Sequence, residues 1–324
     1  MTALKIRGAL VALLMAPAQA GAFSLDWPVD CTRGESCFIQ QYPDRDPGPG
    51  ALDFTCGPLS YDGHSGTDIA LPDLAAMAAG VEVRAAAPGR VRAVRDGMPD
   101  IAIGQPGAPQ LDRNDCGNAV VIDHAEGWET LYCHLRQGSV RVRGGDVVTA
   151  GTPLGLIGLS GQTEFPHLHM GLRRNGAEVD PFDPEGGLDC AALPGRTLWS
   201  APVPYEPGGL IGLGIATEVP GFDAIKAGLP AVPPLNRASA ALVIWAHLYG
   251  TRTGDRLHFT LGGPDGVLLQ ESVVLPRTQA RAMRALGKRR PPAGWPVGEY
   301  TARLTIERAG KRTENALLHF RIGD

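Results

Sequence analysis

The stretch that decides the fold of the first half of the chain runs from residue 117 to residue 135. It reads Gly117-Asn118, Ala119-Val-Val-Ile-Asp-His124, Ala125-Glu-Gly-Trp128 and Glu129-Thr-Leu-Tyr-Cys-His-Leu135. A β-branched run, a short turn-like segment and a run that alternates in polarity together predict a β-hairpin. In the second strand, alternation places Thr130, Tyr132 and His134 on one face.

Short strands separated by glycine turns continue on both sides of this hairpin. Further strands are expected at 140–143, 147–148 and 151–158, with Gly144-Gly145-Asp146 as a turn. Helical periodicity is absent apart from a possible turn around 73–79. The sequence therefore predicts an all-β domain built on an antiparallel, barrel-sandwich-like sheet.

Two histidine signatures lie about a hundred positions apart: His64-Ser-Gly-Thr-Asp68 and Pro166-His167-Leu168-His169, with His134 between them. In a strand, residues i and i+2 point to the same face, so His167 and His169 are expected to project together. A catalytic zinc ion takes three protein ligands and leaves a fourth position for water. His64, Asp68 and one histidine of the pair would supply these ligands and leave two histidines for proton transfer.

The order of the motifs is more specific than any one of them. His64-x-Gly-x-Asp68, the 117–124 strand, Tyr132-x-His134-Leu135, Val147-x-x-x-Gly-x-x-Leu-Gly155, His167-Leu-His169 and Val179-Asp-Pro181 follow one another at compact spacing. Over about residues 60 to 185 this order resembles the lysostaphin-like (LytM-type) zinc metallopeptidases, which cut peptide bonds in bacterial cell-wall peptidoglycan.

The resemblance implies a zinc cofactor held by His64, Asp68 and His169, with His134 and His167 as the catalytic histidines. His124 is expected to support its strand. The chain departs from the family pattern in two places: Phe165-Pro166 replaces the usual small Gly-Pro, and the segment 96–115 resembles an insertion.

Several other functions fit parts of this pattern. Family members that have lost their metal ligands regulate other wall hydrolases, so a non-catalytic envelope regulator is the main alternative. A biotinyl or lipoyl carrier is suggested by the 145–154 pattern, but a carrier needs a modifiable lysine and residues 21–199 contain none. A zinc amidase would share the metal but not the motif order, and a zinc-thiolate cluster is disfavoured because no Cys-x-x-Cys occurs.

The amino terminus has the features of an export signal. Lys5 and Arg7 precede the apolar run Ala9–Ala16, and Ala18-Gln19-Ala20 follows as a cleavage pattern, so residues 1–20 are predicted to be a signal peptide and Gly21 the first mature residue. The run is too short to predict a membrane span. The expected location is periplasmic or secreted.

The mature chain would carry 28 basic and 34 acidic residues, a net charge of −6 that argues against a nucleic-acid partner.

Six cysteines lie in the first two-thirds of the chain, at 31, 37, 56, 116, 133 and 190. In an exported protein an even number suggests three disulfides, although six cysteines allow 15 pairings. Cys31 and Cys37 form the easiest local pair.

The composition predicts four segments after the signal: a cysteine-containing arm (21–59), a zinc metallopeptidase domain (60–190), a Pro/Gly-rich linker (191–235) and an accessory domain (236–324). The arm could lie across the cleft as an inhibitor.

The accessory domain is expected to be an immunoglobulin-like β-sandwich, because strands are expected at 241–248, 255–261, 267–274, 300–306 and 316–322. The basic stretch 281–290 is expected to be solvated or to contact the wall or an envelope protein partner.

Overall fold

The computed structural model describes residues 22–186, 190 and 195–324. The predicted signal peptide over 1–20 and the first mature residue, Gly21, therefore lie outside the described residues. Within the described part of the chain, no helix has both the length and the apolar character needed to cross a membrane.

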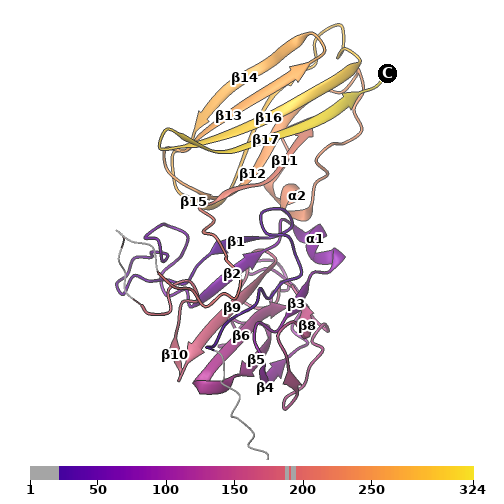
Figure 1. Ribbon diagram of the computed structural model, residues 1–324. Coiled ribbons are helices and arrows are strands. Elements are labelled where there is room, and N and C mark those ends of the chain that lie inside the picture. Colours follow the sequence, from indigo (N-terminus) through magenta and orange to yellow (C-terminus); the bar gives the residue numbers. More distant parts are fainter. Residues whose placement is uncertain (1–21, 187–189, 191–194) are drawn as a thin grey trace, which may run out of the picture.

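The first domain is built on an eight-stranded sheet with the order β1-β2-β9-β6-β5-β4-β7 and with β10 beside β9 (Figure 1). Every ladder in it is antiparallel, which confirms the predicted fold class. The strands are β1 (Phe38–Gln41), β2 (Gly66–Ala70), β4 (Gly89–Arg95), β5 (Asn118–Asp123), β6 (Trp128–Leu135), β7 (Val147–Val148), β9 (His167–Arg174) and β10 (Ala177–Glu178).

The predicted hairpin is formed by β5 and β6, which pair across the short 3-10 turn η1 (Ala125–Gly127). A separate two-stranded ladder joins β3 (Glu82–Arg84) to β8 (Pro153–Leu156). The helical turn expected around 73–79 is α1 (Leu74–Ala79), whose first turn is capped by the Asp73 carboxylate accepting from Ala76 N at 2.8 Å. One apolar core lies beneath these elements and includes Ile69, Val120, Ile122, Tyr132 and Leu168.

The N-terminal segment packs against the main sheet of this domain. β1 pairs with β2, and Leu25, Ile39 and Tyr42 are buried in the same core as the main sheet. The apolar residues between positions 25 and 42 supply this packing.

The second domain is a two-layer sandwich of antiparallel sheets, β11-β12-β15 and β14-β13-β16-β17. Side chains from both sheets meet in one core that includes Ile244, Phe259 and Leu304. The sandwich is therefore present, while its assignment as immunoglobulin-like stays a prediction. The strands are β11 (Gly209–Ala216), β12 (Ala241–Thr251), β13 (Arg256–Gly263), β14 (Gly266–Val274), β15 (Gln279–Arg289), β16 (Gly298–Arg308) and β17 (Lys311–Ile322).

The segment predicted as a linker over 191–235 is more ordered than its composition suggests. Trp199 packs into the core of the first domain, whereas β11 pairs with β12 of the sandwich. The helix α2 (Phe222–Ala227) packs on the sandwich through Phe222 and Ile225. The glycine-rich run 208–214 was not recognised as part of a strand, because glycine is uncommon in strands. Here glycine allows a close contact: a Cβ on Gly214 would lie 2.3 Å from the Trp245 ring.

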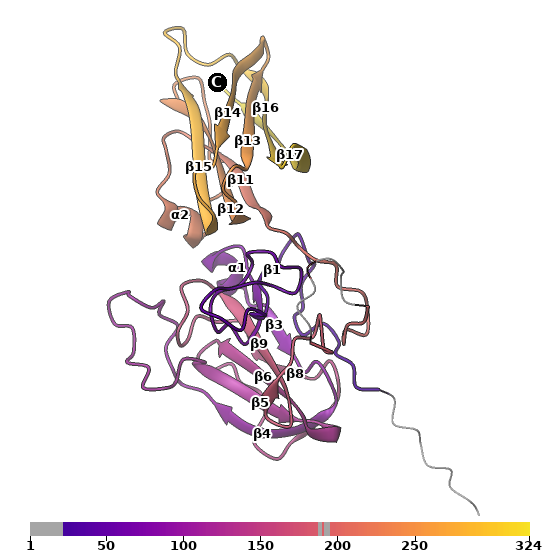
Figure 2. The same cartoon turned by 90° about the vertical axis from the view of Figure 1, so that its left-hand side faces the viewer.

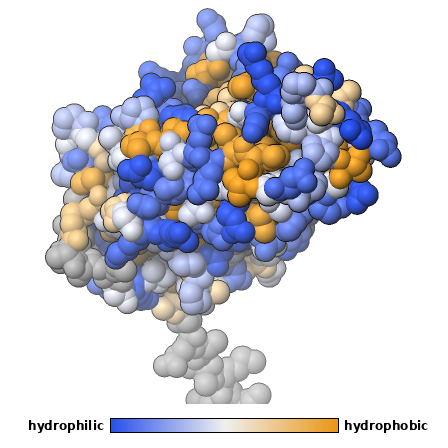
Figure 3. Space-filling model, turned by 90° about the horizontal axis from the view of Figure 1, so that it is seen from above, coloured by the Kyte–Doolittle hydropathy of each residue, from blue (hydrophilic) through white to orange (hydrophobic). Residues whose placement is uncertain are grey.

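The basic stretch 281–290 was not predicted as a strand, yet nearly all of it lies in β15. Its far end, including Lys288 and Arg289, is exposed, as expected for a solvated surface. Seen from the sandwich side, the molecular surface is mostly hydrophilic, with several separate apolar patches (Figure 3).

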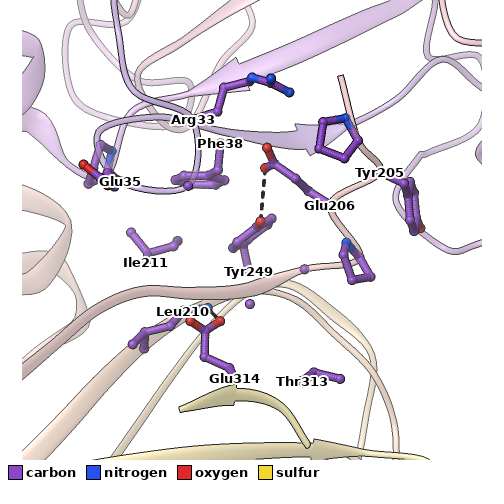
Figure 4. Close-up of a pocket in the computed structure, with 16 residues that line it drawn as sticks. Arg33, Glu35, Phe38, Tyr205, Glu206, Leu210, Ile211, Tyr249, Thr313 and Glu314 are labelled. Carbon is purple, nitrogen blue, oxygen red and sulfur yellow. Dashed lines mark hydrogen bonds between the residues drawn. The ribbon is translucent and has the colours of Figure 1, made fainter. Parts of the chain in front are cut away.

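The two domains touch through specific side chains. Figures 1 and 2 show the sandwich standing on the edge of the first domain near β1 and α1, with α2 beside the contact. The Phe38 and Tyr249 rings lie 4.3 Å apart, and the Tyr249 hydroxyl donates to Glu206 at 3.3 Å (Figure 4). Glu206 also accepts from Ile39 N at 2.8 Å, so one carboxylate joins the first domain, the connection and the sandwich.

All six cysteines are paired, as Cys31–Cys37, Cys56–Cys190 and Cys116–Cys133. The prediction of three disulfides, with Cys31 and Cys37 as a local pair, is confirmed. The second bridge ties the N-terminal segment to the end of the first domain, and the third lies beside His134.

Asp180 gives the first testable prediction. Its carboxyl is 2% exposed and one of its oxygens has no partner, and burial raises its pKa to about 7. Between about pH 4 and 7 the unfolded chain loses this proton while the folded chain keeps it, so the free energy of unfolding should fall by as much as about 4 kcal/mol as pH rises. In Asp180→Asn this fall should disappear, as measured by denaturant unfolding at pH 5 and pH 8.

The exposed Asp265→Asn serves as the matched control and should keep the wild-type pH dependence. An Asp180→Asn protein that loses as much stability as the wild type between the two pH values would contradict the assignment.

Candidate metal centre

Three side chains converge where β2 pairs with β9. In this ladder Asp68 lies directly opposite His169. The Asp68 Oδ1 atom is 2.9 Å from His169 Nδ1 and 3.1 Å from His64 Nε2, and those two nitrogens are 3.2 Å apart. All three candidate ligand atoms lie within 4.8 Å of one another, so the group could hold a metal ion.

The ring of His64 is oriented from outside the cluster. Its Nδ1 lies 2.7 Å from the Tyr42 carbonyl oxygen, which can only accept, so Nδ1 carries a proton and Nε2 is the nitrogen that a metal ion would bind. A ligating histidine is usually fixed in this way, by donating its second ring N–H to a carbonyl or carboxylate. The N-terminal segment, which supplies Tyr42, therefore supports the site.

The carboxyl of Asp68 is 2% exposed and is kept ionised by its neighbours. Burial alone would raise the pKa of Asp68, but His64 and His167 outweigh burial and hold that pKa well below its usual range. For His64, burial lowers the pKa and Asp68 more than compensates, so the pKa is raised overall. An anionic carboxylate between imidazole nitrogens is a donor set that zinc accepts.

The other two predicted site histidines lie against this cluster. The His134 and His167 rings are 4.6 Å apart, and His167 Nε2 is 3.6 Å from Asp68 Oδ1. His134 Nδ1 donates to the Ser160 carbonyl at 2.7 Å, and His167 Nδ1 donates to the Phe165 carbonyl at 2.9 Å. Burial lowers the pKa of both rings. Both are therefore neutral near pH 7, with Nε2 unprotonated.

The predicted faces of β6 are wrong at one position. Tyr132 points into the core, whereas His134 lines the same cavity as Leu131 and Cys133. His134 has a φ of +60°, a left-handed conformation that breaks the strand alternation and turns its side chain to the opposite face. Its N–H donates to the Cys116 carbonyl at 2.8 Å, and the Cys116–Cys133 disulfide holds both flanking segments.

A cavity of about 420 Å³ opens over the cluster. It is lined by His64, His134 and His169 and by residues that the sequence did not single out: Tyr61, Arg113, Asp115, Gln162 and Arg173. Arg113 and Asp115 come from the predicted insertion 96–115, so that segment forms one wall. Of the described residues from 22 to 59, none lines this cavity, and the idea of an inhibitory arm gains no support.

The insertion is attached to the site by buried polar contacts. The side-chain amide of Asn118 accepts from Met98 N at 2.8 Å and donates to Leu135 O at 3.0 Å, and the backbone N–H of Asn118 donates to Ser160 Oγ.

His124 lies away from the cluster and contacts Pro88 O at 2.7 Å and Thr130 Oγ1 at 2.8 Å. It supports its strand, as expected from the sequence.

Comparison with known proteins identifies this kind of domain. Residues 62–181 match the model of Peptidase family M23. The DD-carboxypeptidase/endopeptidase Mpg of Neisseria meningitidis serogroup B is 47% identical over 68 residues, which are 20% of this chain and 14% of Mpg. The cell division protein DipM of Caulobacter vibrioides is 38% identical over 71 residues, 21% of this chain and 11% of DipM. The matches thus span less than a sixth of these relatives' lengths.

Among solved structures, a mutant of the catalytic domain of the prophage-encoded M23 protein EnpA from Enterococcus faecalis is 26% identical, with a TM-score of 0.33. The match covers 50% of this chain and 96% of that domain. Residues 62–181 are a peptidase family M23 domain, which confirms the resemblance found in the sequence.

Gly66 provides a test of the metal centre. A Cβ built on Gly66 would lie 2.6 Å from His169 Nε2 and 2.8 Å from the Met170 carbonyl oxygen, so a side chain there must displace the His169 ring. We expect Gly66→Ala to weaken zinc binding at least about tenfold, as is typical when the support of a ligand is disturbed. Zinc affinity would be measured by competition with a chromogenic chelator.

The matched control is Gly171→Ala, because Gly171 faces Gly66 across the ladder and a Cβ there meets nothing closer than 3.6 Å. If both variants bind zinc as the wild type does, His169 is not a ligand in this geometry.

Proposed function

We propose that the protein is a zinc-dependent endopeptidase that hydrolyses peptide bonds of bacterial peptidoglycan. In this proposal His64, Asp68 and His169 hold the zinc ion, and His134 and His167 are the catalytic residues. The observation that carries the proposal is the convergence of two imidazole nitrogens and one carboxylate oxygen within 4.8 Å, in a domain of Peptidase family M23.

The residues present fit a zinc ion. The donors are of the types that catalytic zinc uses, and the Tyr42 carbonyl accepts the Nδ1 proton of His64, which leaves Nε2 as the nitrogen that zinc would bind. When bound, zinc would polarise the scissile carbonyl and lower the pKa of a water molecule to about 7. The cavity above the cluster gives substrate and water a route to it.

The chain's own contribution is proton transfer and charge stabilisation. His134 and His167 donate Nδ1–H to backbone carbonyls, so each can keep an unprotonated Nε2. His134 lines the cavity, and the Nε2 of His167 lies 3.6 Å from Asp68 Oδ1. Such a ring can take a proton from the attacking water and return it to the leaving amine. Once protonated, it also stabilises the negative charge on the tetrahedral oxygen. Because the two rings are 4.6 Å apart, only one of them is expected to be charged at a time.

The substrate and location follow from independent features. The Mpg relatives carry the name DD-carboxypeptidase/endopeptidase, which favours a peptide of the cell wall. Three disulfides are typical of an oxidising compartment, so we propose a periplasmic or secreted protein. The alternative is a non-catalytic envelope regulator, but a regulator has no need of an intact ligand set and two neutral histidines.

Digestion of purified sacculi tests the proposal. The zinc-loaded mature protein, from Gly21, should release peptide fragments identified by mass spectrometry, and His169→Ala should release none. His124→Ala, a histidine of the same sheet outside the site, is the matched control and should retain activity. If the wild type binds zinc and releases nothing, the regulatory alternative replaces the proposal.

The roles of the two histidines give a separate prediction. His134→Ala and His167→Ala should each keep bound zinc, because neither is a ligand, and lower kcat by about 100-fold to 10,000-fold, the usual contribution of a general acid or base. Zinc content would be measured by atomic absorption next to the rate. Loss of zinc from either variant would show that the ligand set has been misassigned.

A further inference from the structure

His134, one of the two proposed catalytic residues, lies in an irregular part of the sheet. In the register of β5 with β6, the single residue Ala119 stands opposite two residues, Cys133 and His134, which is a β-bulge. The ladder of β6 with β9 ends at the pair of Cys133 and His169. His134 therefore has a ladder partner in neither β5 nor β9, two strands that the structure describes in full. Its left-handed backbone, with a φ of +60°, is held by contacts outside the ladders.

Two of these contacts lead to the segment around Cys116. His134 N donates to the Cys116 carbonyl at 2.8 Å, and the His134 ring donates from Nδ1 to the Ser160 carbonyl at 2.7 Å. Ser160 is itself fixed by the same segment. A Cβ on Gly117 would lie 2.3 Å from the Ser160 carbonyl oxygen, and Asn118 N donates to Ser160 Oγ at 2.9 Å. A shift of this segment would therefore move both acceptors of His134.

The Cys116–Cys133 disulfide joins the two sides of this arrangement covalently. One cysteine carries the carbonyl that accepts from His134 N, and the other is the residue of the bulge directly before His134. A β-bulge interrupts the ladder hydrogen bonds of a strand, so a covalent bond at this point supplies a constraint that the sheet does not. Opening the bond would leave His134 positioned by hydrogen bonds alone.

The disulfide is also within reach of molecules that enter the cavity over the metal centre. Cys116 and Cys133 both line this cavity, which has a volume of about 420 Å³. Cys133 is 2% exposed, whereas Cys116 is half-buried, so a thiolate would reach the Cys116 sulfur first. The structure describes the other four cysteines as well, and none of them lines the cavity. This bridge thus combines contact with a catalytic histidine and access from the substrate side.

We propose that the Cys116–Cys133 disulfide is a redox-controlled positioning element of the active site. When closed, it orients His134 for proton transfer, and when a dithiol opens it, catalysis slows. The inference rests on the proposed function and deepens it, because it names a regulation of the same site. The candidate metal ligands lie on β2, on β9 and just before β2, and the disulfide ties none of these segments, so zinc binding should survive its opening.

The chemistry is thiol–disulfide exchange with a dithiol as the reductant. A thiolate of the dithiol attacks the Cys116 sulfur, the S–S bond breaks, and Cys133 leaves as a thiolate that takes up a proton. The second thiol of the reductant then displaces Cys116 from the mixed disulfide. The protein gains two electrons and two protons as two thiols, and the dithiol becomes a disulfide. A disulfide oxidant reverses the reaction.

The test opens the bridge without adding a thiol, because thiols themselves bind zinc. The zinc-loaded, mature Cys116→Ala/Cys133→Ala protein should digest sacculi about 100-fold more slowly than the wild type, a loss that a misplacement of about 1 Å can cause. Its zinc content, measured by atomic absorption, should equal that of the wild type. In NMR spectra of protein with ¹³C-labelled histidine, the ring signals of His134 should shift, while those of His124 should not.

Cys31→Ala/Cys37→Ala is the matched control, since it removes a bridge outside the cavity and should leave the digestion rate and the His134 signals unchanged. A Cys116→Ala/Cys133→Ala protein that digests sacculi at the wild-type rate overturns the proposal.

If the Cys116→Ala/Cys133→Ala variant fails to fold, the wild type is reduced with dithiothreitol in excess zinc and re-oxidised with oxidised glutathione. The digestion rate and the His134 ring signals should change on reduction and return on re-oxidation. Signals that stay constant while alkylation and mass spectrometry detect free thiols at positions 116 and 133 overturn the proposal equally.

The redox control and the proposed function fail separately in these measurements. A wild type that digests sacculi and is unaffected by opening of the bridge refutes the redox control alone. A wild type that binds zinc and digests nothing, although opening of the bridge moves the His134 ring, refutes the proposed function alone.

Discussion

The whole site depends on one buried carboxylate. Asp68 is 2% exposed, and a carboxylate so far from water is costly unless cations or hydrogen-bond donors surround it. Here His64 and His169 are within 3.1 Å of its Oδ1 and His167 lies at 3.6 Å. The pairing of β2 with β9 sets this arrangement, because Asp68 and His169 are opposite residues of one ladder. A metal cation in the same place would offset the negative charge of the Asp68 carboxylate.

The remaining residues of the site hold these side chains in their required orientation. Backbone carbonyls of Tyr42, Ser160 and Phe165 each accept an Nδ1 proton, from His64, His134 and His167 respectively. Three rings are thereby fixed in the tautomer that leaves Nε2 free. The carbonyls come from two segments: Tyr42 follows β1, and Ser160 and Phe165 lie in the connection between β8 and β9. Function is thus distributed over the first domain, although the ligands themselves come from two short motifs.

Local periodicity explains what could be predicted from the sequence. The β5–β6 hairpin and the shared face of His167 and His169 follow from strand alternation, whereas the ligand set is a prediction that rests on the family resemblance. The left-handed His134 could not be predicted, since no glycine marks it. The supporting carbonyls were also missed, because any residue carries a carbonyl and only the folded chain shows which one accepts. In the segment 191–235, proline and glycine content suggested a linker, while tertiary pairing with β12 made part of it a strand.

The interface between the domains follows from a substitution that the sequence showed without explaining. Phe165 stands where the family pattern has a small residue, and a large ring at that position needs a partner on its outer face. Arg281 of the sandwich supplies it at 4.2 Å, while Phe38 and Tyr249 close the apolar contact beside it. The same ring also lies 4.6 Å from the His167 ring. One aromatic ring thus connects the sandwich to a candidate catalytic histidine.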